Sequence, residues 1–280
     1  MKFSKMHGLG NDFVVIDAIT QQVLMRPELA RQLADRKRGV GCDQVLLAEP
    51  PRRSDTHARY RIFNADGSEV EHCGNGVRCL ALFLHRQGLC STNRMVIEVG
   101  DRTALVCLLD DGRFEVDMGQ PMLEPLAVPI DVDAVSIHPG QASYLLPLQD
   151  RAVFVTALSM GNPHAIIEVS DVDQAPVEEL GPLIETHPAF PDRVNVGFIE
   201  VADRTHIRLR VYERGCGETQ ACGTGACAAV VAGQLHGWLD DHVDVALTGG
   251  HLQISWQGAG RSVQMTGPAV HVFDGVWPSV

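Results

Sequence analysis

The chain has 280 residues, of which 45% are hydrophobic and 21% are charged, and its formal net charge is −12 at pH 7. This composition excludes a disordered, collagen-like or coiled-coil protein, and the length favours about two domains. The acidic charge disfavours a protein that binds nucleic acid mainly through phosphates or binds an anionic membrane surface, and no apolar run approaches the ~18 residues that a membrane-spanning helix needs.

Short strand-like segments separated by turns occupy much of the chain. Their residues alternate in polarity or are β-branched, and turns such as Asp110-Asp111-Gly112 separate them. We therefore expect an α/β protein that is rich in strands, with the proline-rich stretch 121–147 as a linker. The predicted strands are, in chain order, 13–16, 45–47, 59–63, 95–99, 104–109, 113–118, 165–169, 207–212 and 262–265.

Two apolar runs of helical length each follow a Cys-Gly-x-Gly turn. The first turn is Cys-Gly-Asn-Gly at 73–76 and its apolar run ends at Gly88; the second is Cys-Gly-Thr-Gly at 222–225 and its run ends at Gly237. A glycine is well suited to the position after a helix C-terminus. A helix that is apolar on most faces is usually buried. We therefore expect each half of the chain to wrap strands around a central helix.

The two predicted helices belong to a repeat that runs along the whole chain. The segment GNDFVVID at 10–17 resembles GNPHAIIE at 161–168, 151 residues later (161 − 10), and the same separation aligns Gln44 with Asn195. The two Cys-Gly-x-Gly turns lie 149 residues apart (222 − 73), and 116–121 resembles 263–268 at 147 residues (263 − 116). Because the matches keep their order, the sequence predicts two related, pseudo-symmetric α/β halves.

Cys73 and Cys222 are the residues with the clearest chemical potential. Each lies at the start of a predicted helix, where unpaired N–H groups and the helix dipole favour negative charge, so we expect a thiol pKa below the ordinary value of about 8.5. The neighbouring glycines let backbone N–H groups approach an anion. Two duplicated thiols suggest a substrate held between them: one thiolate removes a proton from a carbon, and the opposite thiol delivers one to the other face.

Composition also bears on cofactors and location. The chain has only three lysines (Lys2, Lys5 and Lys37), and none is a good candidate for the Schiff base that a pyridoxal enzyme needs. It contains neither C-x-x-C nor H-E-x-x-H, so we expect no metal and no other cofactor. Eight cysteines are too few for a disulfide scaffold at this length, and the first residues turn polar before a signal peptide could form, so we expect a cytoplasmic protein.

Several longer motifs resemble the diaminopimelate epimerase family: HGLGNDFVVID, GCDQ, FNADGSEVEHCGNGVRC, GNPH, RVNVGF and YERGCGETQACGTGACA, found between residues 8 and 268. The resemblance implies a pyridoxal-independent isomerase that interconverts LL- and meso-diaminopimelate in lysine and peptidoglycan precursor biosynthesis. It also implies a homodimer whose subunits have two domains, with the active site in the cleft between them. The expected domains are 1–120, joined by a C-terminal strand at about 268–280, and 121–267.

The resemblance assigns roles to residues at the matching positions. Cys73 and Cys222 are the two acid/base thiols, and His164 and Glu213 tune their pKa values. Donors for the reacting carboxylate come from Gly74, Asn75, Gly223 and Thr224. The remaining substrate is held by Asn11, Gln44, Asn64, Asn162, Asn195, Glu213 and Arg214. Arg214 suits the distal carboxylate because a guanidinium pairs with it through two hydrogen bonds, and Glu213 suits the distal ammonium group.

Other functions remain open at this point. A proline racemase-like cofactor-free isomerase would also use paired cysteines, but its compact substrate would leave Glu213 and Arg214 without a role. A thiol–disulfide oxidoreductase would lack the usual C-x-x-C spacing. A binding module without chemistry would carry two oxidation-prone thiols. His164 is equally well interpreted as a structural histidine, and Cys216, in the same loop as Cys222, has no assigned role.

Overall fold

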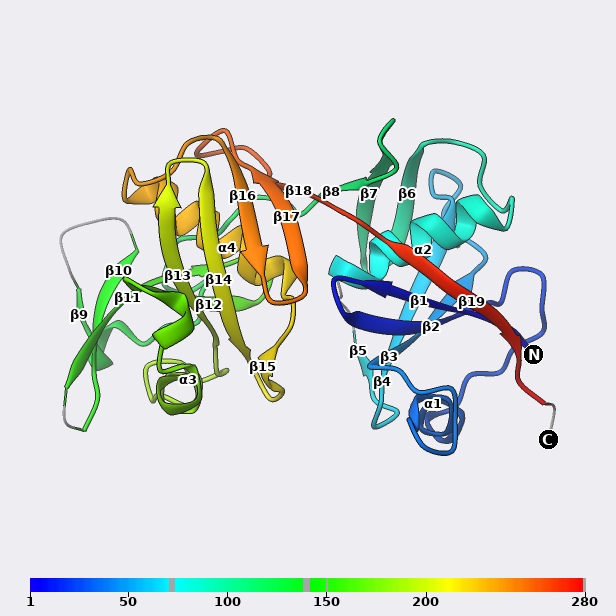
Figure 1. Cartoon of the computed structure of the whole chain (residues 1–280), viewed down its shortest axis with the longest axis horizontal. Helices are drawn as coiled ribbons and strands as arrows, with labels where there is room; N and C mark the ends of the chain where they lie inside the picture. Colours follow the sequence, from blue (N-terminus) through cyan, green and yellow to red (C-terminus); the bar gives the residue numbers. More distant parts are fainter. Residues whose placement is uncertain (71–73, 138–141, 150, 279–280) are drawn as a thin grey trace. The chain divides into compact units, whose positions relative to one another are not determined.

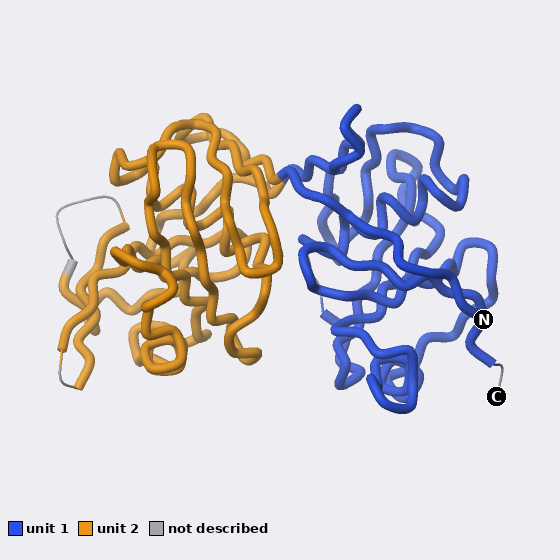
Figure 2. The backbone as a smooth tube through the Cα atoms, in the orientation of Figure 1, with its two compact units in different colours: residues 1–117, 266–280 blue, residues 118–265 orange. Residues whose placement is uncertain are grey.

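The computed structural model describes residues 1–70, 74–137, 142–149 and 151–278, so Cys73 lies outside the described residues. The chain forms two compact units (Figure 2): unit 1 comprises Met1–Asp117 and Thr266–Val280, and unit 2 comprises Met118–Met265. Both units combine strands with helices, which confirms the predicted α/β fold class.

In unit 1, most strands pair with the next strand along the chain, and most of these pairs are antiparallel (Figure 1). Strands β2 and β3 are parallel, as are β4 and β6, while β1–β2, β3–β4, β4–β5, β6–β7 and β7–β8 are antiparallel. The C-terminal strand β19 pairs antiparallel with β1. The strands are β1 (Lys2–Gly8), β2 (Asn11–Asp17), β3 (Gln44–Glu49), β4 (Ala58–Asn64), β5 (Glu69–Val70), β6 (Arg94–Val99), β7 (Arg102–Leu108), β8 (Phe114–Asp117) and β19 (Val270–Val276).

Unit 2 repeats this succession of pairs. Strands β12 and β13 are parallel, as are β14 and β16, while β11–β12, β13–β14, β14–β15 and β16–β17 are antiparallel. Strand β10 pairs antiparallel with β11, as β19 pairs antiparallel with β1 in unit 1, and β18 contains the point where the chain returns to unit 1. The strands are β9 (Ser136–Ile137), β10 (Ser143–Pro147), β11 (Ala152–Ser159), β12 (Pro163–Glu168), β13 (Asn195–Asp203), β14 (His206–Glu213), β15 (Gly217–Thr219), β16 (His242–Leu247), β17 (Gly250–Ser255) and β18 (Gln264–Gly267).

The strand register confirms the repeat predicted from the sequence. Phe13 lies opposite Gln44 between β2 and β3, and their counterparts His164 and Asn195 lie opposite each other between β12 and β13. Phe63 likewise lies opposite Glu69, as Tyr212 lies opposite Glu218. In both units, therefore, equivalent residues lie opposite each other in these strand pairs.

Each unit has one central helix, as predicted. Helix α2 (Gly74–Arg86) contacts β1, β2, β3, β7, β8 and β19, and α4 (Gly223–Leu235) contacts β11, β12, β13, β14 and β17 (Figure 1). Both helices end in the same way: Gly88 and Gly237 have positive φ, and the residue after each glycine donates its N–H to the carbonyl five positions earlier. This Schellman ending is the one that a glycine at this position favours.

Two further helices, α1 (Pro27–Ala34) and α3 (Val177–Glu185), were not predicted from the sequence. They occupy equivalent places, since α1 lies between β2 and β3 in the chain and α3 lies between β12 and β13. Each covers one face of its unit, with α1 packed on β3 and β4 and α3 packed on β13 and β14. They complete the crossovers that the parallel pairs β2–β3 and β12–β13 require.

The prediction of a linker at 121–147 is wrong. This stretch contains the strands β9 and β10, and β10 pairs with β11. Its apolar side chains Val128, Ile130, Tyr144 and Leu146 are buried in the core of unit 2. The prolines of this stretch do not prevent burial of the apolar residues between them. Because these residues are buried, the stretch is part of the core of unit 2 and not a linker.

Candidate active site

In unit 2, Cys222 lies at the N-cap position of α4. Its backbone is extended and only 4% of its surface is exposed. The following helix starts with small residues because the space is tight: a Cβ on Gly225 would lie 3.3 Å from the Cys222 Sγ atom. The thiol is therefore enclosed by the first turn of the helix.

The environment of Cys222 corrects the expectation of a lowered thiol pKa. Burial raises the pKa of Cys222 well above its ordinary value, and the negative charge and hydrogen bond of Glu213 raise it further. The Thr224 hydroxyl and the Gly225 N–H lower the pKa, but by less. Desolvation of the thiolate thus outweighs the favourable helix end, and Cys222 is a protonated thiol at neutral pH.

A chain of hydrogen bonds connects Cys222 to His164. The Thr224 Oγ1 atom lies 3.5 Å from the Cys222 Sγ atom and accepts a hydrogen bond from the Asn162 Nδ2 atom at 3.3 Å. Since the Thr224 oxygen accepts from Asn162, its own hydrogen is available to the sulfur. The Asn162 Oδ1 atom in turn lies 3.1 Å from the His164 Nε2 atom.

His164 is fully buried at the far end of this chain. Burial lowers its pKa to about 3, and the positive charge of Arg214 acts in the same direction. The imidazole is therefore neutral at physiological pH. Its proton is assigned to Nε2, because the carbonyl oxygen of Asn162 can only accept a hydrogen bond. His164 thus orients the Asn162 amide, which orients the hydroxyl beside the thiol.

Glu213 is the last residue of β14, and Arg214 follows it directly in the chain. The Thr219 hydroxyl donates to the Glu213 Oε1 atom at 2.5 Å, which fixes the carboxylate near Cys222. Arg214 is exposed, and its guanidinium donates to the carbonyl of Asp192 at 2.9 Å. The exposed guanidinium is accessible to a carboxylate, and the half-buried Glu213 to an ammonium group.

Asn195 has a different character from the other predicted binding residues. It is 3% exposed, and both ends of its amide contact backbone: Nδ2 donates to the Pro163 carbonyl at 2.9 Å, and Oδ1 accepts from the Arg214 N–H at 3.0 Å. Asn195 therefore connects the start of β12 to Arg214, the residue that follows β14.

Two residues that hold predicted site segments of unit 2 in place, Thr219 and Glu185, were not predicted from the sequence. Thr219 fixes Glu213 as described, and the buried Glu185 accepts a hydrogen bond from the Gly215 N–H at 2.8 Å, which holds the loop after Arg214. Thr219 lies inside the motif GCGETQACGTG, so its position was a signal that could have been used. Glu185 ends α3, and no local pattern in the sequence indicates its contact.

Unit 1 brings Asn11, Gln44 and Asn64 to one end of its strands. Asn11 starts β2, Gln44 starts β3, and Asn64 ends β4 opposite Gln44. The Gln44 Nε2 atom donates to the Asn64 Oδ1 atom at 2.9 Å, and the Asn11 Nδ2 atom donates to the Asp43 Oδ2 atom at 2.9 Å. Within the described part of the chain, the buried Gln44 Oε1 atom has no hydrogen-bond partner, so it is a candidate acceptor for a ligand.

The remaining predicted residues occupy the first turns of the two helices. Gly74 and Asn75 begin α2, and Gly223 and Thr224 begin α4, where their first-turn N–H groups lie beside Cys222. Cys73, the predicted partner of Cys222, is outside the described residues. The described site residues therefore form one group in unit 1 and another group in unit 2.

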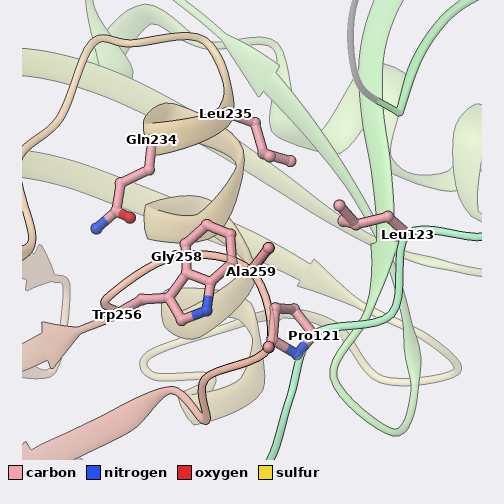
Figure 3. Close-up of a pocket in the computed structure, with 8 residues that line it drawn as sticks. Pro121, Leu123, Gln234, Leu235, Trp256, Gly258 and Ala259 are labelled. Atoms are coloured by element: carbon pink, nitrogen blue, oxygen red, sulfur yellow. The ribbon is translucent and has the colours of Figure 1, made fainter.

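A pocket of about 360 Å³ lies at the opposite end of α4 from Cys222 (Figure 3). Its lining includes Pro121, Leu123, Leu235 and Trp256, and it contains none of the predicted site residues. Over residues 1–70, 74–137, 142–149 and 151–278, no group of three or more His, Cys, Asp or Glu side chains could hold a metal ion. In the same ranges, no helix is long and apolar enough to cross a membrane.

Comparison with known proteins adds to this geometry. The chain matches the family model described as diaminopimelate epimerase over residues 3–124 and 156–272. A protein named diaminopimelate epimerase from Alkalilimnicola ehrlichii is 58% identical over 278 residues, which cover 98% of each chain. One of the same name from Halorhodospira halophila is 58% identical over 275 residues, which cover 98% of this chain and 94% of the relative.

Solved structures show the same fold at much lower identity. A probable proline racemase from Agrobacterium radiobacter, solved with bound carbonate, has a TM-score of 0.68 and 17% sequence identity, covering 99% of this chain and 92% of that chain. At this identity, the likeness shows that the two proteins share a fold, and it says nothing about a shared reaction.

Proposed function

The chain belongs to the diaminopimelate epimerase family, and we propose from this membership that it is an isomerase that interconverts LL- and meso-diaminopimelate. The reaction supplies precursors for lysine and peptidoglycan. The proline racemase-like alternative is not favoured, because the two named relatives match nearly the whole chain at 58% identity, whereas the racemase structure shares only 17%. The distal pair Glu213 and Arg214 also suits a substrate that has a second amino-acid group.

The proposed reaction uses two thiols and no cofactor. One thiolate takes the proton from the substrate α-carbon; the C–H bond breaks, and the electron pair is delocalised into the adjacent carboxylate. The opposite thiol then gives its proton to the other face of the carbon, which inverts the configuration. Cys222 is the proton donor in one direction, with Cys73 as the base, and the roles exchange in the reverse direction.

The buried thiol of Cys222 is the observation that carries this mechanism. It lies at the N-cap of α4, next to Glu213 and at the end of the hydrogen-bond chain through Thr224 and Asn162. A protonated thiol is the form that a proton donor needs at neutral pH. The first-turn N–H groups at Gly223 and Thr224, and those of Gly74 and Asn75, would stabilise the negative charge that develops on the carboxylate.

The proposal includes a homodimer that acts in the cytoplasm. Support for the dimer comes from the resemblance and from strand β19, which exposes 52% of Val272 and 72% of Val276. Exposed apolar side chains along a strand are typical of a surface that pairs with a second copy. Light scattering of the purified protein tests the subunit number.

The activity itself is tested by incubating the protein with LL-diaminopimelate and separating the stereoisomers. We expect formation of the meso isomer without added metal and without pyridoxal absorbance in the protein. L-proline serves as the control substrate and should not be racemised. Rapid conversion of proline with no conversion of diaminopimelate would contradict the proposal and favour the racemase-like alternative.

A further inference from the structure

Arg78 is a buried charged residue that the mechanism has not used. It lies on α2, four positions after Gly74, and it is 0% exposed and the largest of the fully buried side chains in the described part of the chain. Arginine is almost never fully buried, because removing its charge from water costs several kcal/mol unless hydrogen bonds compensate. The contacts of the guanidinium should therefore indicate its role.

The guanidinium holds the first turn of its own helix. The Arg78 Nη2 atom donates to the side-chain oxygen of Asn75 at 3.0 Å, and Nη1 lies 3.5 Å from the carbonyl of Gly74. The Nε atom donates to the carbonyl of Pro268 at 3.2 Å, in the segment between β18 and β19. Arg78 thus connects two residues assigned to the substrate carboxylate with the segment that returns from unit 2.

The segment before Asn11, a second residue proposed to bind the substrate, packs against Arg78 and Asn75. Gly8 ends β1, and a Cβ on Gly8 would lie 3.4 Å from both the Arg78 Nη2 atom and the Asn75 carbonyl oxygen. Leu9 and Gly10, with φ of 58° and 86°, form the tight turn that leads from Gly8 to Asn11. Arg78 therefore lies where the turn before Asn11 meets the turn of Asn75.

The equivalent position in unit 2 shows that helix packing does not require this arginine. The residue 149 positions after Arg78 is Cys227 (227 − 78), a buried small side chain on α4. There, the counterpart of Asn75 is Thr224, and its hydroxyl is held by Asn162 from the neighbouring strand. A first-turn residue is thus fixed in both units, but by a different group in each.

From these contacts we propose that Arg78 is a positioning residue for the epimerase reaction. Its guanidinium holds the Asn75 side chain and the first turn of α2 in the orientation that binds the reacting carboxylate. This inference rests on the proposed function, because the benefit of a fixed Asn75 is the placement of that carboxylate for proton transfer.

The test compares Arg78→Met and Arg78→Lys with Arg86→Met, a matched control at the exposed end of the same helix. Arg78→Met removes the hydrogen bonds to Asn75, Gly74 and Pro268, and we expect kcat for LL-diaminopimelate to fall on the order of 10- to 100-fold while KM changes by less than about 3-fold. Arg78→Lys keeps the charge without the planar fork, so it should recover only part of kcat. Arg86→Met should behave like the wild type.

Hydrogen–deuterium exchange supplies a readout that does not depend on turnover. Backbone amides at 74–78 should exchange faster in Arg78→Met than in Arg86→Met. A folded Arg78→Met protein with wild-type kcat and wild-type exchange at 74–78 overturns the inference. If Arg78→Met does not fold, Arg78→Lys decides, since wild-type kcat and exchange in that variant also overturn it. If the wild type leaves diaminopimelate unchanged, the proposed function fails, and the exchange comparison still tests the positioning role.

Discussion

Helices α2 and α4 occupy equivalent places in the two units, but different groups hold the side chains of their first turns. Both helices follow the same strand succession, and both end in a Schellman motif at a glycine. Yet Asn75 is held by Arg78 from within its own helix, whereas Thr224 is held by Asn162 from a neighbouring strand. The two units have thus kept the same strand pairing, whereas the side chains that hold the first helical turn differ between them.

The divergence extends to charge. Glu213 contacts Cys222 in unit 2, and the residue 149 positions earlier (213 − 64) is the neutral Asn64. A carboxylate beside a buried thiol favours the protonated form, and an amide has no such effect. Glu213 therefore favours the protonated form of Cys222, and the residue at the equivalent position of unit 1 carries no charge.

Replacing either thiol should produce the largest effect, because it removes one of the two proton-transfer groups. We expect Cys73→Ala and Cys222→Ala each to lower kcat by more than about 10³-fold. Cys227→Ala, a change of another buried thiol on α4, is the matched control and should retain most activity. The measurement is LL-to-meso conversion together with circular dichroism. Turnover like that of the wild type in either catalytic variant contradicts the account.

Glu213→Gln tests the difference in charge between the units by removing it. Burial and Glu213 both raise the pKa of Cys222, so removing the carboxylate lowers that pKa. In the direction where Cys222 donates the proton, activity is lost as pH rises through this pKa, and the alkaline limb of the rate profile should move to lower pH. We also expect kcat/KM to fall on the order of 10- to 100-fold, because the distal ammonium group loses its partner.

Alkylation by iodoacetamide measures the same change directly. Cys222 in Glu213→Gln should react faster at neutral pH than in the wild type, because more of it is thiolate. Glu218→Gln is the control, since Glu218 lies on the neighbouring strand β15 and forms an ion pair with Arg210. An unchanged alkylation rate in Glu213→Gln would show that Glu213 does not set the protonation of Cys222.

His164→Phe would make unit 2 resemble unit 1, where Phe13 occupies the equivalent position. The change removes the donor that orients Asn162, and we expect kcat to fall by about 10-fold. Burial lowers the pKa of His164 to about 3, so the ring is neutral from pH 5 to pH 9 in the wild type and the variant should lose no titration in this range. Loss of an acid limb near pH 6 in the rate profile would contradict this role.

Thr219→Val tests the hydrogen bond that holds the Glu213 carboxylate, and we expect it to have the smallest effect. The hydroxyl of Thr219 donates one hydrogen bond to Glu213, and valine keeps the shape without the donor. Loss of one such bond corresponds to about 1 kcal/mol, and we expect kcat/KM to fall by about 5-fold. The thermal unfolding midpoint should change little. A larger loss than in Glu213→Gln would indicate that Thr219 acts on more than this carboxylate.

Local patterns predicted the parts of the fold that depend on local chemistry. The helices after the two Cys-Gly-x-Gly turns and the strand pair around Gln44 follow from apolar runs, closing glycines and the repeat. Strand β10 was hidden by prolines, and its burial depends on distant parts of unit 2. The pKa of Cys222 was predicted with the wrong sign because the helix end is visible in the sequence, whereas burial and the approach of Glu213 are not. Arg78 looked like one polar residue in an apolar helix, and only its contacts indicate a role.

The most direct test of two thiols acting on opposite faces is the distribution of deuterium early in the reaction. Wild-type protein is incubated with LL-diaminopimelate in D₂O, and the two stereoisomers are separated and analysed by mass spectrometry. The account predicts deuterium at the inverted carbon of the meso product, while the recovered LL isomer keeps its hydrogen. Deuterium entering the LL isomer as fast as the product, or a product without deuterium, would contradict it.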